Sequence, residues 1–148
     1  MTQENKQLLL KDICARLPYK VIGRYCLYDS KGNLTDWGNE PEIVENIDLQ
    51  KEKIWTDDTV QGYYLDEFKM YLRPMDSMTE EEKEEYEMLQ TYPGFKTNHT
   101  DLTDMYDWLN AHHFDYRGLI PMRLALEASD SILARLLYII NVLKLGLL

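Results

Sequence analysis

The sequence brings metal-ligating residue types together at only one place, the run His112-His113-Phe114-Asp115. A zinc site needs three or four such side chains that converge on one point. Adjacent residues on a helix point about 100° apart, so His112 and His113 cannot easily bind the same ion. His112 and Asp115 could converge at a helix end, and His99 would then have to arrive from a loop. A small metal-dependent enzyme that uses His112, His113 and Asp115 is therefore the alternative function, not the leading one.

The simpler expectation for the two histidines is a structural role. We expect His113 to pack with Tyr106 and Leu109 on the inner face of a helix. One or both histidines would cap the C-terminus of that helix, where the helix dipole favours a protonated imidazole. On this expectation the chain holds no metal and no other cofactor.

Nucleophilic catalysis has weaker support in the sequence. A Cys–His pair would need Cys14 or Cys26 beside His112, and no spacing places them together. The chain contains no Gly-x-Ser-x-Gly, no phosphate-binding glycine loop and no His-Glu-x-x-His. Two cysteines are also too few for a disulfide framework or a four-cysteine zinc site. We therefore expect a protein that is not an enzyme.

The densest run of charge is acidic and extends from Glu80 to Glu87. Regularly spaced carboxylates can take the place of phosphates in a groove that binds nucleic acid electrostatically. Tyrosine is a frequent anchor at interfaces. An ordinary solvated helix face is the other interpretation of such a run. The predicted binding residues are Glu80, Glu81, Glu84, Glu85 and Tyr86.

The charge of the whole chain limits the classes of partner. The formal net charge is −10 over 148 residues. Such a charge disfavours contact with nucleic acid or with an anionic membrane, and it favours a partner that presents a basic surface. We expect a protein partner of that kind, no direct binding of nucleic acid and no membrane association.

The elements that must position these residues follow from hydrophobic periodicity. Leu10, Ile13 and Leu17 recur at helical spacing near the start, and alternation from residue 20 to 28 predicts a strand. A turn over 30–33 would lead into a returning strand over 34–37. Residues 39–61 are expected to form irregular β-structure, and residues 65–72 a short helix or strand that ends at Pro74.

Two helices are predicted in the second half of the chain. Thr79 and Glu82 have the spacing of a capping box, so a helix should begin there and end near 92–94. A second helix should run from about residue 100 to His113, with an inner stripe made of Leu102, Met105, Tyr106, Leu109 and His113. We therefore expect an α+β fold: a small antiparallel sheet with two or three packed helices and an apolar C-terminal helix.

The composition changes abruptly at Ser129, which divides the chain into a single acidic α+β domain over 1–128 and an apolar helix over 129–148. Arg135 and Lys144 interrupt the apolar run, so we do not expect it to span a membrane. Three interpretations stay open. The helix could be buried in its own domain or in an interface between copies; it could be an appended segment; or it could lie on a membrane surface.

Two blocks of sequence together resemble a known group of proteins. They are Tyr71–Glu82 (YLRPMDSMTEEE) and Tyr106–Ile120 (YDWLNAHHFDYRGLI). In these blocks the chain resembles small acidic proteins encoded by phages and prophages of gut Bacteroidetes, and 17–19 is similar to their opening. The resemblance covers roughly residues 10–128. It implies an origin and no chemistry: a phage or prophage protein in the cytoplasm of a bacterial host cell. Such proteins usually end in a short polar tail after 124–128, so the apolar helix departs from their pattern.

Overall fold

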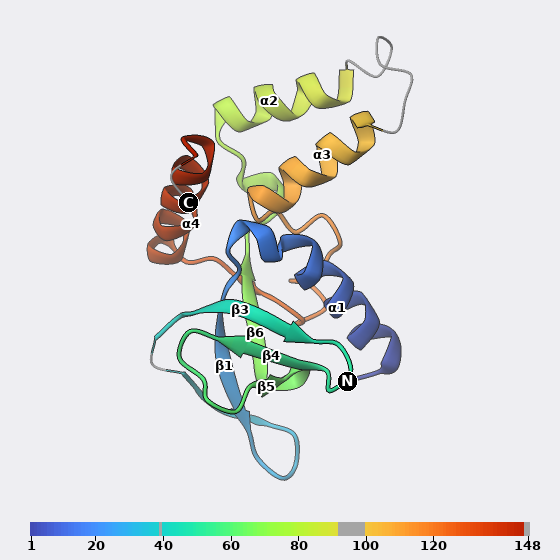
Figure 1. The fold of residues 1–148 in the computed structure, drawn as a ribbon, viewed down its shortest axis with the longest axis vertical. Helices are drawn as coiled ribbons and strands as arrows, with labels where there is room; N and C mark the ends of the chain where they lie inside the picture. Colours follow the sequence, from blue (N-terminus) through green and yellow to red (C-terminus); the bar gives the residue numbers. More distant parts are fainter. Residues whose placement is uncertain (39, 92–99, 147–148) are drawn as a thin grey trace.

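A computed structural model describes residues 1–38, 40–91 and 100–146 (Figure 1). It confirms the predicted α+β class. The described residues form four α-helices and a seven-stranded sheet whose strands are mostly antiparallel. The helices are α1 (Gln3–Arg16), α2 (Glu80–Thr91), α3 (Thr100–Ala111) and α4 (Asp130–Lys144).

The sheet has the strand order β5-β4-β3-β1-β6-β7, and β2 pairs with β1 outside this path. Only the β6–β7 pairing is parallel among the pairings of the described strands. The strands are β1 (Ile22–Tyr28), β2 (Leu34–Trp37), β3 (Glu42–Asp48), β4 (Lys53–Thr56), β5 (Tyr63–Tyr64), β6 (Phe68–Leu72) and β7 (Leu126–Glu127).

The region over 40–61 is more regular than the sequence predicted, because β3 and β4 pair with each other across a short turn. A buried carboxylate, Glu42, links these strands to β5. Its oxygens accept hydrogen bonds from the Thr56 hydroxyl at 2.6 Å and from the Tyr63 hydroxyl at 3.0 and 3.1 Å. Burial and the neighbouring Glu42 raise the pKa of Tyr63 above its ordinary value, so this hydroxyl stays a donor.

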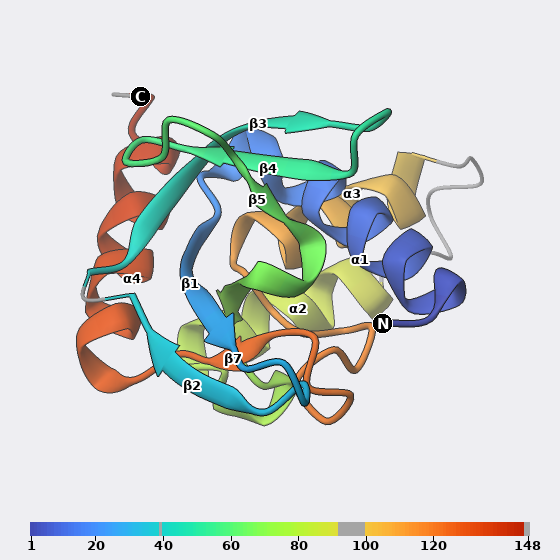
Figure 2. The same ribbon diagram turned by 90° about the horizontal axis from the view of Figure 1, so that it is seen from below.

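The sheet has a helix on each side, as Figures 1 and 2 show: α1 covers one face and α4 the other. Under α1 lies the larger apolar cluster, which includes Leu9, Ile13 and Phe68. Under α4 lies a second cluster, in which Leu136 meets Ile22 of β1. The core is therefore split between the two faces of the sheet.

Helix α4 is packed into the structure by one face. Ile132, Leu136 and Ile140 are buried, while Tyr138 is 70% exposed. Ser129 caps the helix by accepting a hydrogen bond from the amide of Ile132. These contacts agree with a helix buried in its own fold. The division at residue 128 and self-association through this helix stay predictions. Within the described ranges, none of the helices has the length and apolarity that crossing a membrane requires.

Helices α2 and α3 lie side by side and project from one end of the sheet (Figure 1). The predicted capping box starts α2: the amide of Glu82 donates to the Thr79 hydroxyl, and the Thr79 amide donates to the Glu82 carboxylate. The predicted inner stripe of α3 is wrong at Tyr106, which is 46% exposed. Trp108 faces α2 instead. Helix α3 also ends at Ala111, before His113.

Candidate functional site

The C-terminus of α3 meets the end of β6 at a buried arginine. Arg73 is 1% exposed, and its guanidinium donates two hydrogen bonds to the Glu82 carboxylate, at 2.7 and 2.6 Å. It also donates to the backbone carbonyl of His112 at 3.2 Å and lies 4.2 Å from the centre of the Phe114 ring. Burial alone would raise the pKa of Glu82, but hydrogen bonds from Arg73 and Thr79 lower it below its ordinary value.

A second buried arginine reaches the same turn from α1. Arg16 forms two hydrogen bonds with the Asp12 carboxylate, at 2.8 and 3.1 Å, and donates to the Phe114 carbonyl at 2.7 Å. Both Arg16 and Asp12 are fully buried. Together with Arg73, it places two cations at the negative end of α3, which the helix dipole favours.

The histidines have a structural role, but not as cations. The Nδ1 of His112 lies 2.8 Å from the Trp108 carbonyl, so Nδ1 must carry the hydrogen and donate it. The imidazole stacks on Trp108 with 4.0 Å between ring centres. Burial lowers the pKa of His112, so the ring is neutral at pH 7. The predicted capping of α3 is therefore present, but the predicted protonated imidazole is wrong, because burial disfavours the charged form of the ring.

His113 lies beyond the helix in a left-handed conformation with φ of 62°. It is 1% exposed, and burial, with the nearby charges of Arg16 and Arg73, lowers its pKa to about 3. This conformation is uncommon for residues other than glycine, and among those residues asparagine, aspartate and histidine adopt it most often. The left-handed residue lets the chain leave α3 and form a bridge between Phe114 and Arg73.

The metal-dependent alternative receives no support from this arrangement. The Asp115 carboxylate accepts hydrogen bonds from the amides of Leu119 at 2.7 Å and Ile120 at 2.9 Å, so it holds its own loop. In the part of the chain that the structure describes, His, Cys, Asp and Glu do not form a group of three or more that could hold a metal ion. His112, His113 and Asp115 are thus close in sequence but do not form a ligand set. His99 lies outside the described residues.

The five predicted binding residues separate into two groups. Glu85 and Tyr86 face α3: the Glu85 carboxylate accepts from Trp108 Nε1 at 2.9 Å, and Tyr86 stacks on the same indole at 5.7 Å. Glu85 also pairs with Lys144 of α4 at 3.5 Å. These two residues are therefore partly buried and fix α2 in place. Their part in binding a partner stays a prediction.

The other three predicted residues, Glu80, Glu81 and Glu84, are exposed. The Glu80 side chain is 88% exposed and pairs with Lys83, the one basic residue of α2, at 3.0 Å. Helix α3 adds exposed aspartates and contains no lysine or arginine. We call this surface the acidic arm, defined by the exposed residues Glu80, Glu81, Glu84, Glu87, Asp104 and Asp107.

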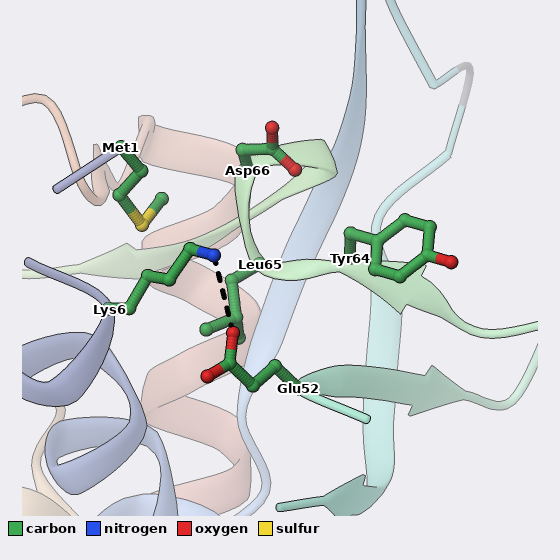
Figure 3. A pocket seen from close by; sticks show the side chains of 6 residues that line it. All are labelled: Met1, Lys6, Glu52, Tyr64, Leu65 and Asp66. Carbon is green, nitrogen blue, oxygen red and sulfur yellow. Dashed lines mark ion pairs between the residues drawn. The ribbon is translucent and has the colours of Figure 1, made fainter. Parts of the chain in front are cut away.

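The surface also has hollows away from the acidic arm. Figure 3 shows a pocket of about 310 Å³ between α1 and the strands β4 and β5. In it, the Lys6 ammonium lies beside Leu65 and pairs with Glu52 at 3.3 Å, while the Tyr64 ring points away. Since Lys6 already has a carboxylate partner, its ammonium is not an unpaired charge that an anion in this pocket could meet.

Sequence reasoning missed the residues that organise this region, Arg16 and Arg73. Asp12 lies on the same helix as Arg16, but the other partners lie in other elements: Arg16 contacts a carbonyl 98 residues away, and Arg73 pairs with Glu82 nine residues further on. Two signals were available: the i, i+4 spacing of Asp12 and Arg16, and an arginine directly after the apolar strand that ends at Leu72. Comparison with protein families, curated proteins and solved structures found no match to this chain. The resemblance to phage and prophage proteins therefore stays a prediction.

Proposed function

We propose that this protein is a non-catalytic binding protein that engages a protein partner with a basic surface through the acidic arm. The observation that carries the proposal is that the carboxylates on the two sides of α2 have different surroundings. Its inner carboxylates, Glu82 and Glu85, are bound to Arg73 and Trp108, whereas its outer carboxylates face solvent. In keeping with the sequence resemblance, the partner would be a host protein in the cytoplasm of a bacterium, modulated by a phage protein.

The inner contacts give the acidic arm a fixed orientation. Two hydrogen bonds from Arg73, which follows β6, hold Glu82 of α2, and the stack of Tyr86 on Trp108 joins α2 to α3. A surface that is already ordered loses less conformational entropy when it binds. The carboxylates of α2 are therefore presented on a preorganised helix.

The charge of the acidic arm suits recognition by electrostatics. Helix α2 contains six glutamates and one lysine, and α3 contains three aspartates and no basic residue. These two helices hold most of the formal net charge of −10. A concentrated charge of one sign accelerates encounter with an oppositely charged surface and repels nucleic acid and anionic membranes. The proposal accordingly includes neither as a direct partner.

Affinity capture from nuclease-treated bacterial lysate, followed by binding measurements with the purified partner, tests the proposal. The test variant is Glu81→Lys/Glu84→Lys, and the matched control is Glu4→Lys/Glu45→Lys, which changes two exposed acids elsewhere. We expect a stoichiometric basic partner that binds the wild-type protein and the control equally. The test variant should lose at least about 1–2 kcal/mol of binding free energy. Equal binding by the two variants, or an empty capture, would contradict the proposal.

A further inference from the structure

A groove of about 530 Å³ lies near the start of α2, between residues 74–76 and the loop 115–121. The segment 74–76 follows β6, and the loop follows α3. The bridge between Arg73 and Phe114 holds these two stretches of chain together. The hydrogen bonds from the amides of Leu119 and Ile120 to Asp115 fix the shape of the loop. The groove is therefore built from segments that the buried core positions.

The charged side chains that line the groove are all acidic. They are Asp76, Asp115 and Glu127, and no lysine or arginine lines it. Asp115 is buried and bound to backbone amides, whereas Asp76 and Glu127 are exposed. Within the described ranges, the carboxylates of Asp76 and Glu127 have no hydrogen-bond or ion-pair partner. The groove thus offers two carboxylates to a cation that approaches from outside.

The rest of the lining is largely apolar. Pro74 and Met75 form one side, and Ile120 and Pro121 form the other. An arginine side chain has the matching composition, because its aliphatic stem packs on apolar surface while its guanidinium pairs with carboxylates. Arginine is also among the residues that most often anchor protein interfaces.

We propose that this groove receives an arginine side chain from an extended segment of the protein partner. The inference rests on the proposed function and assigns the anchoring contact, while the acidic arm attracts the partner. Asp76 precedes Glu80 by four residues, which places the two within about 14 Å along the chain. One basic surface can therefore reach both the groove and the start of α2.

The test uses the full-length, ¹⁵N-labelled protein and two synthetic peptides, acetyl-Leu-Arg-Leu-amide and its citrulline counterpart. Citrulline keeps the shape of arginine without its charge. We expect the arginine peptide to shift the amide signals of Gly118, Ile120 and Glu127 saturably, with an affinity about tenfold above that of the citrulline peptide. Absent shifts at millimolar peptide, or equal affinities, would overturn the inference.

Paired variants separate the groove from the acidic arm. Asp76→Asn/Glu127→Gln should weaken the arginine peptide about tenfold, and Glu81→Gln/Glu84→Gln, which removes the same charge from α2, should leave the shifts in place. The opposite pattern would refute the groove and leave the proposed function standing. If the arginine peptide binds tightly but the partner binds the acidic-arm variant as well as the wild-type protein, the proposed function would be refuted and the inference about the groove would stand. Concentration-dependent shifts without peptide would assign the groove to a second copy and overturn the inference.

Discussion

At the scale of single residues, Arg73 connects the sheet, the acidic helix and the turn after α3. Its guanidinium holds the Glu82 carboxylate, the His112 carbonyl and the face of the Phe114 ring. Because it is 1% exposed, it cannot exchange these partners for water. The orientation of α2, and with it that of the acidic arm, depends on this side chain together with the contacts of Glu85 and Tyr86 to Trp108.

Removing the Glu82 carboxylate, the charged partner of Arg73, should destabilise the folded state. Glu82→Gln leaves a buried guanidinium without its counter-charge and should lower the free energy of unfolding by about 3–5 kcal/mol. The matched control is Glu81→Gln, which changes an exposed neighbour and should have an effect within about 0.5 kcal/mol. Urea unfolding followed by circular dichroism measures both. Similar stabilities for the two variants would show that the Arg73–Glu82 pair does not organise the region.

His113 should make the protein sensitive to acid. Its pKa is about 3 in the folded state against an ordinary value of 6.5, so below pH 6.5 the unfolded chain binds a proton that the folded chain does not. Stability should therefore fall as the pH falls from 6.5 towards 3, by about 1.4 kcal/mol per pH unit from this residue. His112 has a lowered pKa as well and acts in the same direction.

The variant that tests this pH dependence is His113→Asn, since asparagine tolerates the left-handed conformation. Unfolding by urea at pH 7.5, 6.0 and 5.0 gives the slope of stability against pH for each protein. The slope between pH 6.0 and 5.0 should be smaller in the variant by about 1.4 kcal/mol per pH unit. An unchanged slope would mean that His113 is not buried in its neutral form.

At the scale of elements, the sequence predicted features that depend on neighbouring residues better than contacts between residues far apart in the chain. The predicted capping box at Thr79 is present, because it depends on two residues only three positions apart. The predicted end of α3 near His113 lies two residues beyond the observed end at Ala111, and a histidine with φ of 62° takes the place of the glycine that often follows a helix. The two buried arginines were missed because tertiary packing brings the Phe114 carbonyl to Arg16 and the Glu82 carboxylate to Arg73.

The acidic run shows the limit of reading charge from sequence. Glu82 and Glu85 look identical to their neighbours in composition, yet one binds Arg73 and the other binds Trp108 and Lys144. What separates inner from outer carboxylates is the side of α2 on which each one lies, because Arg73, Lys144 and Trp108 contact only the inner side. Three of the five predicted binding residues therefore remain on the surface, and two serve the fold.

Helix α4 should contribute to stability through its buried face. Leu136 is fully buried, so Leu136→Ala should cost about 2–5 kcal/mol of unfolding free energy. The control Tyr138→Ala, at a residue 70% exposed on the same helix, should cost far less. Thermal or urea unfolding of the two variants provides the measurement. If Leu136→Ala behaved like its control, α4 would not be part of the core.

At the scale of the whole molecule, negative charge is concentrated on α2 and α3, the two helices that project from one end of the sheet (Figure 1). The sheet with α1 and α4 forms the body, and α2 and α3 extend from one end of it (Figure 1). The acidic arm therefore stands away from the surface of the body. Electrostatic encounter with a basic partner depends on such an arrangement and weakens as salt screens the charges over about 8 Å at physiological ionic strength.

The measurement that tests this account most directly is the rate of association with the purified basic partner as a function of salt. The account predicts that Glu81→Lys/Glu84→Lys lowers the association rate constant about tenfold or more at low salt, with the difference shrinking as salt rises. Glu4→Lys/Glu45→Lys, which makes the same change in net charge, should associate nearly as fast as the wild-type protein. Equal losses in the two variants, or rates that do not respond to salt, would contradict recognition through the acidic arm.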